Sequence, residues 1–380
     1  MDILRGALGL IALLGLAWLI SEDRRHLRLR IVCAALALQI GLALLLLKFP
    51  PAAAFFFSLN AAVLALQTAT DAGTSFVFGY LGGGPAPFAE TEPSASFILA
   101  FRAFPLVLVI SALASLLLYF GILQRIVGAL AFALRHTLGV GGALGLGAAV
   151  HIFVGMIEAP LLVRPYLKTM SRGELFALMA CGMAGIAGTV MVIYAALLRP
   201  VIPDSLGHIL IASIISTPAA LAVAAIMVPF DQSAGKAARL ELVDPPSTAM
   251  EAIARGVHDG IGIVANIIFG FQPIMWLIGI PWAETATAAT LMGAKTVLNE
   301  FVAYIDLSRL PTEALSVRSK LIMTYALCGF ANFGSLGIMI GGLTAMAPER
   351  KHDIVALGFR SIIAGTLATC MSGAVVGMLI

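Results

Sequence analysis

The feature that most constrains this chain is a series of apolar runs, each about as long as a bilayer core is thick. A helix needs about 20 predominantly apolar residues to cross that core. Of the 380 residues, 60% are hydrophobic and only 11% are charged, whereas soluble domains carry about 25% charged residues. So few charged side chains cannot cover a water-soluble particle of this size. We therefore expect an all-α integral membrane protein.

The crossing candidates are eight runs near residues 4–20, 31–48, 97–120, 174–198, 207–229, 258–280, 317–343 and 354–380. Two further apolar stretches, 138–168 and 284–307, differ because each holds a glutamate and other polar residues near its middle. Non-helical backbone at membrane depth is tolerated only inside protein or beside a water-filled cavity. We predict two re-entrant hairpins here, with tips that meet at a site. Residues 49–96 are less apolar and predict an interfacial helix followed by an ordered loop.

The distribution of basic residues predicts an orientation. If the eight runs cross alternately and each hairpin returns to its own side, most of the 23 lysines and arginines fall in loops on one side. Basic loops face the cytoplasm, so both termini are expected outside a cell membrane, the inner membrane if the protein is bacterial. The net charge is only +3 and no basic block is present, so no nucleic-acid partner is expected.

Cysteine usage indicates neither a disulfide framework nor a metal site. Four cysteines, Cys33, Cys181, Cys328 and Cys370, lie singly in apolar stretches, without a CxxC pair or a histidine at zinc spacing. We expect buried free thiols.

Two segments of the chain share one order of features. Glu158 is followed by a Gly-rich interruption of an apolar run at 182–188, and Glu300 is followed by another at 329–337. Three predicted crossings separate the two units, so the second is inverted relative to the first. Inverted repeats with broken helices are typical of secondary transporters, which bind substrate and ion near the midplane. The alternative is that these glycines only permit close helix packing.

The two acids carry the functional hypothesis. An ionised glutamate at membrane depth is costly unless it is paired or hydrated, and such residues mark functional sites by default. Lys295 lies close to Glu300 in the same stretch and is a candidate charge partner. Besides transport, an intramembrane enzyme with the glutamates as acid and base, or a sensor that binds without transporting, fits this pattern.

Three motifs together resemble the concentrative nucleoside transporter family. They are GMIEAPLLVRPYL at 155–167, KTVLNEFVAY at 295–304 and ALCGFANFGSLG at 326–337. The resemblance covers roughly residues 97–380. It implies a homotrimer of eight-span protomers, each with two hairpins, a scaffold and a moving transport domain. It also implies a nucleoside-like substrate imported with a coupling ion, H⁺ or Na⁺, and neither an enzymatic activity nor a cofactor.

On this resemblance the chain divides into five parts. Residues 1–96 hold the N-terminal spans and the interfacial segment, and 97–137 a scaffold span with a connector. The first repeat covers 138–229, a connector and scaffold span cover 230–283, and the second, inverted repeat covers 284–380.

The resemblance also implies roles for substrate-binding residues. Glu300, Asn332 and Ser335 would hold the ribose hydroxyls, with Phe330 beside the sugar or base. The remaining implied substrate positions are Met156, Ile157, Glu158 and Val190. The family carries Gln and Thr where this chain has Met156 and Ile157, which cannot form the same hydrogen bonds. An apolar wall discriminates by only about 1–3 kcal/mol, so we expect a less selective or differently selective pocket, or a permease for another polar solute such as a modified nucleoside or sugar conjugate.

The coupling ion is a second departure from the family. The implied ion positions are His151, Val154, Gly185, Ile186 and Glu158. Where the family has an asparagine and a hydroxyl side chain, this sequence has His151 and Gly185. A hard cation requires oxygen ligands, which these side chains do not offer. We therefore predict proton coupling, with the proton taken by His151, Glu158 or Glu300; the alternative for His151 is a neutral imidazole hydrogen-bonded to a carbonyl.

Overall fold

The computed structural model describes residues 2–25, 27–88, 122–140, 142–153, 155, 156, 158–230, 271–311 and 313–380. These residues form helices and connecting segments, with no strand among them. The all-α prediction is therefore confirmed for this part of the chain. The predicted crossing at 97–120 and most of the one at 258–280 lie outside the described residues.

The amino-terminal helices are α1 (Asp2–Leu19), α2 (Leu29–Lys48), α3 (Pro50–Phe78) and α6 (Ile122–Leu138), with a short 3-10 turn, η1, at Gly79–Gly82. The middle of the chain forms α7 (Gly142–Val150), α8 (Glu158–Leu162), α9 (Arg164–Leu167), α10 (Arg172–Ala184), α11 (Gly188–Leu198) and α12 (Ser205–Met227). The last part forms η2 (Trp282–Glu284), α15 (Thr285–Val297), α16 (Glu300–Arg309), α17 (Val317–Leu327), α18 (Phe333–Met346), η3 (Pro348–Arg350) and α19 (Lys351–Leu379).

On length and composition alone, three helices among the described residues could cross a membrane: Leu29–Lys48, Ser205–Met227 and Pro348–Leu379. The runs predicted at 174–198 and 317–343 are each divided into two shorter helices. The break after α10 covers residues 185–187, and the break after α17 covers 328–332. Both predicted Gly-rich interruptions therefore end a helix in the structure.

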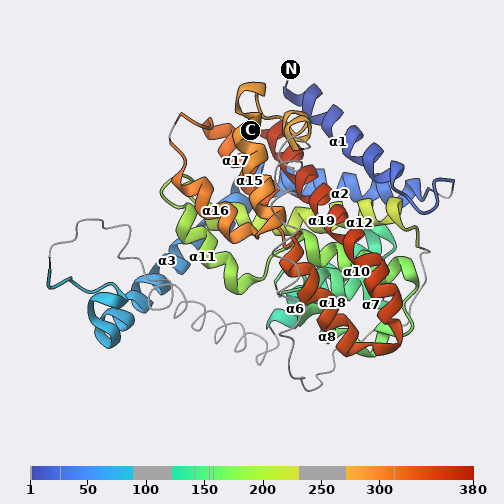
Figure 1. The fold of residues 1–380 in the computed structure, drawn as a ribbon, viewed down its shortest axis with the longest axis horizontal. Coiled ribbons are helices and arrows are strands. Elements are labelled where there is room, and N and C mark those ends of the chain that lie inside the picture. The colour runs from blue at the N-terminus through green and yellow to red at the C-terminus, as the bar shows by residue number, and fades with distance from the viewer. Residues whose placement is uncertain are drawn as a thin grey trace.

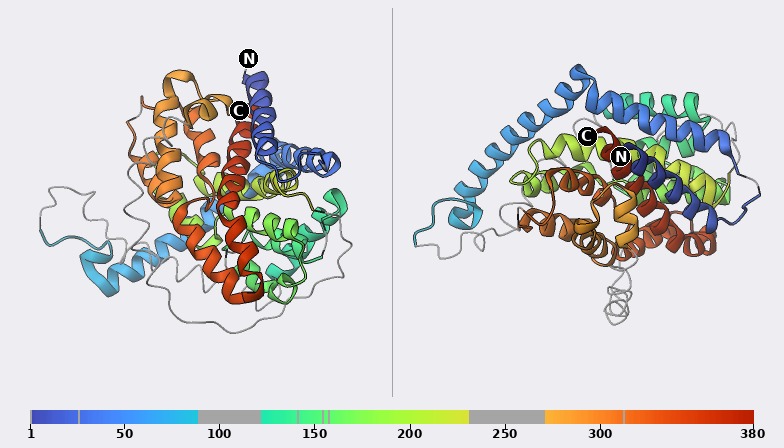
Figure 2. Two further views of the ribbon diagram at one scale, coloured as in Figure 1. Left: turned by 45° about the vertical axis from the view of Figure 1, so that its right-hand side comes forward. Right: turned by 90° about the horizontal axis from the view of Figure 1, so that it is seen from above.

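Helices α12 and α19 form the centre of the packing (Figure 1). Residues along almost the whole of α12 are buried, and both helices contact α10, α17 and α2. Helix α1 lies antiparallel to α19, because Gly6 approaches Met378 at one end and Glu22 pairs with Arg360 at the other. The two chain termini consequently lie at the same end of the molecule (Figures 1 and 2).

The two predicted repeats contain corresponding helices in the same order. A helix pair (α7 and α8, or α15 and α16) precedes a broken helix, which precedes a long helix (α12 or α19). Glu158 is the first residue of α8, and Glu300 is the first residue of α16. The glutamates therefore occupy the same position in both units, as the sequence predicted.

One cysteine prediction was wrong. Cys181, Cys328 and Cys370 are buried free thiols, but Cys33 is exposed. Helix α2 buries a stripe that includes Ile31, Ala35 and Gln39, and Cys33 lies outside this stripe. An apolar sequence around a cysteine does not reveal which face of the helix packs against protein.

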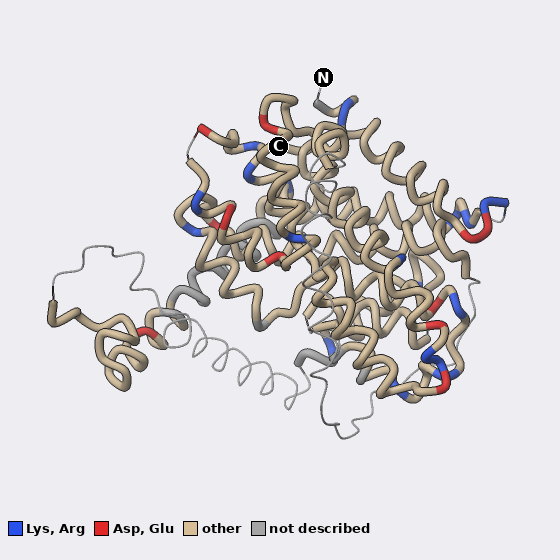
Figure 3. The backbone as a smooth tube through the Cα atoms, viewed as in Figure 1, with Lys and Arg blue, Asp and Glu red and all other residues tan. Residues whose placement is uncertain are grey.

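Charged residues gather in the connecting segments (Figure 3). Glu22, after α1, accepts hydrogen bonds from Arg172 at 3.0 and 3.3 Å and pairs with Arg360 at 3.2 Å. Arg172 also pairs with Asp353 at 2.9 Å, and Arg350 pairs with the same carboxylate at 3.0 Å. This network joins the segment after α1 to the first turns of α10 and α19.

Replacing Glu22 with glutamine is expected to lower the free energy of unfolding by about 1 kcal/mol at low salt, because two arginines lose a shared carboxylate. Salt screens such contacts, so the difference from wild type should shrink at 1 M NaCl. Thermal unfolding in detergent at both salt concentrations measures it. Glu349→Gln is the control, because Glu349 and its partner Lys168 are both exposed. Equal effects of the two substitutions would show that the network adds nothing beyond a surface pair.

Candidate functional site

The breaks of the two divided helices contact each other directly. The carbonyl of Gly185, between α10 and α11, accepts a hydrogen bond from the backbone N–H of Phe330, between α17 and α18, at 3.1 Å. A Cβ atom on Gly329 would lie 2.8 Å from the Met183 carbonyl oxygen, so this approach requires glycine. The interruptions of both repeats therefore meet backbone to backbone.

We call the place where the two helix breaks meet the crossing of the broken helices. A buried carboxylate lies beside it. Glu300, at the start of α16, is only 3% exposed. Its Oε1 accepts a hydrogen bond from the Tyr194 hydroxyl of α11 at 2.6 Å. Its Oε2 accepts a hydrogen bond from the Asn332 side-chain amide at 3.0 Å. Both carboxylate oxygens are thus held by donors from other elements, one from each repeat.

Two helix N-termini surround this carboxylate. Asn332 caps α18, because its Oδ1 accepts a hydrogen bond from the Ser335 N–H at 2.7 Å. In the same way Asn299 caps α16 through the Val302 N–H at 2.9 Å. The cap fixes the Asn332 amide so that its NH₂ group faces Glu300. Helix N-termini carry partial positive charge and favour an anionic group, so the arrangement suits a carboxylate.

Lys295, the candidate charge partner of Glu300, directs its hydrogen bonds to two other groups. This fully buried ammonium donates hydrogen bonds to the Ala326 carbonyl at 2.8 Å and to the Thr369 hydroxyl at 3.0 Å. Ala326 lies in the last turn of α17, where carbonyls lack partners within the helix. A cation stabilises a helix C-terminus. Lys295 therefore joins α15 to the broken end of α17 and to α19.

His151 lies in the turn after α7, close to the last turn of α10 and its break. The side chain is 3% exposed, and its Nε2 has no hydrogen-bond partner among the described residues. A Cβ on Gly182 would lie 3.0 Å from His151 Cε1, 3.0 Å from Met339 Cε and 3.3 Å from Met156 Cβ. The absence of a side chain at Gly182 makes room for the imidazole beside two methionines.

Several of the remaining predicted positions lie in the two breaks or in the first turn that follows each of them. Gly185 and Ile186 are buried within it, and Val190 is half-buried in the first turn of α11. A Cβ on Gly185 would lie 3.3 Å from the His151 carbonyl, so these two predicted ion positions are neighbours. Phe330 is half-buried at the crossing, and Ser335 is buried in α18. Val154, Ile157 and the Glu158 side chain lie outside what the structure describes.

Sequence reasoning missed Tyr194. The residue lies within the apolar run of α11 and is 3% exposed, so it resembles an ordinary core aromatic. The available signal was its hydroxyl, since a buried tyrosine hydroxyl normally has a hydrogen-bond partner. Nothing in the local sequence identifies Glu300 as that partner.

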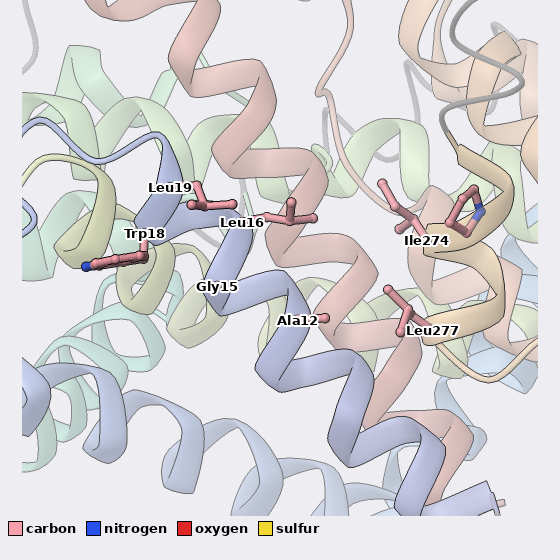
Figure 4. Close-up of a pocket in the computed structure, with 8 residues that line it drawn as sticks. Ala12, Gly15, Leu16, Trp18, Leu19, Ile274 and Leu277 are labelled. Carbon is pink, nitrogen blue, oxygen red and sulfur yellow. The ribbon is translucent and has the colours of Figure 1, made fainter.

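A separate apolar hollow of about 620 Å³ lies between α1 and residues 273–277 (Figure 4). Its lining consists of Ala12, Gly15, Leu16, Trp18, Leu19, Pro273, Ile274 and Leu277. None of these side chains is titratable, and the Trp18 indole N–H donates to the Arg24 carbonyl. This lining offers a polar solute little to bind, so the candidate site is the crossing beside Glu300.

Comparison with known proteins matches most of the chain to nucleoside transporters, the proteins that its sequence motifs resemble. Family models match at residues 8–81 (Na⁺ dependent nucleoside transporter N-terminus), 100–201 (nucleoside recognition) and 268–377 (Na⁺ dependent nucleoside transporter C-terminus). An uncharacterized transporter of Haemophilus influenzae is 36% identical, over 100% of this chain and 98% of the relative. The nucleoside permease NupC of Helicobacter pylori is 31% identical, over 98% and 96%.

Solved structures of CNTnw also match this chain. CNTnw in an inward-facing, substrate-bound state matches with a TM-score of 0.84 and 30% identity, over 100% of this chain and 98% of CNTnw. A variant of CNTnw in an outward-facing state matches with a TM-score of 0.85. These relatives, together with the fold, define a helical membrane transport protein and not an enzyme. The chain belongs to the concentrative, Na⁺-dependent nucleoside transporter family.

Proposed function

We propose that this protein imports nucleosides across a cell membrane by alternating access, coupled to a proton gradient. The observation that carries the substrate assignment is the buried cluster of Tyr194, Glu300 and Asn332 at the crossing of the two broken helices. A carboxylate accepts hydrogen bonds from hydroxyl groups, and an amide can also donate to them. This chemistry fits vicinal ribose hydroxyls, with Ser335 and Phe330 nearby on the same broken helix.

The proposal of proton coupling rests on the residues at the implied ion positions. The positions that would hold sodium by side-chain oxygens are His151 and Gly185, and neither supplies one. His151 Nε2 is buried without a partner among the described residues. An imidazole nitrogen of this kind can take a proton, as can the carboxylates Glu158 and Glu300. The H⁺ would thus replace the Na⁺ of the family description.

We further propose the assembly and orientation that the family implies. Stretches 138–168 and 284–307 would be re-entrant hairpins within an eight-span protomer of a homotrimer, and both would move with the transport domain against a scaffold. Termini at the same end of the molecule support an even number of crossings. The basic residues of the Glu22 network lie at the far end of α1 from its amino terminus, which supports termini outside the cell.

Uptake of radiolabelled uridine and adenosine into proteoliposomes tests this function. An inwardly directed proton gradient is expected to drive accumulation, a sodium gradient alone is not, and other ribosides should compete. Protein-free vesicles under the same gradients give the baseline. Binding of uridine without accumulation would indicate a sensor.

The absence of both binding and uptake in tight vesicles would favour another polar solute. Met156, buried at 7% exposure beside His151, is the observation that points to that alternative, because it replaces an amide expected to serve the base.

A further inference from the structure

The hydrogen bond between Tyr194 and Glu300 joins the two repeats at the substrate cluster. Tyr194 belongs to α11 of the first repeat, whereas Glu300 and Asn332 belong to the second. The distance of 2.6 Å between the hydroxyl and Oε1 is that of a short O–H···O hydrogen bond, and bonds to an ionised carboxylate are charge-assisted. Such bonds are about twice as strong as neutral ones, so this contact has a large influence on how the carboxylate lies.

The Tyr194 ring is itself held in place. Its centroid lies 5.1 Å from the ring of Tyr304 and 5.9 Å from the ring of Phe301, both on α16. Aromatic pairs at these separations stabilise one another beyond simple burial. The hydroxyl therefore meets Glu300 from a fixed direction, and the carboxylate cannot rotate without losing this donor.

The remaining hydrogen-bonding capacity of Glu300 matches a diol. An ionised carboxylate has about four acceptor positions on its two oxygens. Tyr194 occupies one position on Oε1 and Asn332 occupies one on Oε2. About two positions remain, one on each oxygen, which is the number that two vicinal hydroxyls require.

Building on the proposed nucleoside transport, we propose that Tyr194 is a positioning residue that sets selectivity for the ribose diol, by holding Glu300 so that one free acceptor position on each oxygen faces the substrate. Tyr194 acts through Glu300, without itself contacting the sugar hydroxyls. The first repeat thereby contributes to ribose recognition by the second.

The test is a comparison of two buried tyrosines with two substrates. Tyr194→Phe removes the donor to Glu300. Tyr304→Phe is the matched control, because the Tyr304 hydroxyl is equally buried but donates to the Thr324 carbonyl at 2.8 Å. KM for uptake or competition is measured for uridine and for 2′,3′-dideoxyuridine, which lacks the diol. Melting temperature and gel filtration verify that each variant is folded.

In Tyr194→Phe we expect KM for uridine to rise about tenfold, the effect of weakening hydrogen bonds to a charged group. KM for 2′,3′-dideoxyuridine should change less than about twofold, because that analogue does not use the freed acceptor positions. Tyr304→Phe should not alter the ratio of the two KM values. Equal losses for both substrates in Tyr194→Phe, or the same ratio change in Tyr304→Phe, would overturn the proposal.

A second measurement needs no variant. The wild-type protein should lose affinity for 2′-deoxyuridine and for 3′-deoxyuridine alike, because each analogue leaves one acceptor position empty. Full affinity for either analogue would contradict the proposal. Failure of the wild type to bind or transport any nucleoside would instead refute the proposed function, so the two failures are distinguishable.

Discussion

Uptake of uridine is expected to fall about 100-fold in Vmax/KM when Glu300 is replaced by glutamine. The carboxylate now accepts hydrogen bonds from both Tyr194 and Asn332. A glutamine amide has one oxygen, so its NH₂ group must face one of these donors. Each hydrogen bond to a charged group is worth about 1.5–3 kcal/mol, so at the lower end of this range the loss of two such bonds to the substrate amounts to about 3 kcal/mol, or about 100-fold.

Initial rates of uridine uptake over a concentration series, in proteoliposomes with an imposed proton gradient, measure this effect. Glu349→Gln is a control, because Glu349 lies in the exposed turn before α19 and should transport like wild type. If Glu300→Gln retains uptake within a few-fold of wild type while remaining folded, Glu300 does not hold the substrate and the site must be sought elsewhere.

The second large effect is a gain of sodium-dependent uptake, which is expected when the residues at two implied ion positions are replaced. In the double variant His151→Asn and Gly185→Ser, a sodium gradient should stimulate uridine uptake at least about tenfold, a coupling free energy within the usual range for linked sites. The asparagine and serine provide side-chain oxygens, which a hard cation requires. A Cβ at 185 would lie 3.3 Å from the His151 carbonyl, so a serine fits after a shift of a few tenths of an ångström.

Uptake by the double variant and by each single variant, under sodium or proton gradients, measures the change. Each single variant supplies only one of the two oxygens and should respond weakly to sodium. A double variant that transports but remains indifferent to sodium would refute the assignment of these positions to the ion site. Strong sodium stimulation of the wild type would refute proton coupling itself.

Much of this fold could be predicted because membrane helices obey strong local rules. The apolar runs near 31–48 and 207–229 correspond closely to α2 and α12, since about 20 apolar residues leave the chain few alternatives. The breaks at 185–187 and 328–332 were visible as glycine clusters. The equivalent positions of Glu158 and Glu300 followed from the order of features alone.

The features that could not be predicted from the sequence depend on contacts between distant segments. Tyr194 and Glu300 are 106 residues apart, and no local pattern marks their hydrogen bond. Lys295 is close to Glu300 in sequence, yet its ammonium extends to Ala326 and Thr369. The exposure of Cys33 likewise depends on which face of α2 meets α12. The residue types indicated that these groups need hydrogen-bond partners or burial. Only the packing of distant segments determines which partner each group finds and which helix face is buried.

The position of Lys295 makes the two repeats electrically unequal. If the glutamates are aligned, Lys295 of the second repeat corresponds to Phe153 of the first. The carbonyl end of α17 thus has a positive charge permanently attached to the chain, whereas the aligned residue of the first repeat, Phe153, is uncharged. A covalently attached cation cannot be exchanged with either side of the membrane. The second repeat therefore keeps a fixed positive charge at a position where the first repeat has a neutral side chain, although the helices around the two positions occur in the same order.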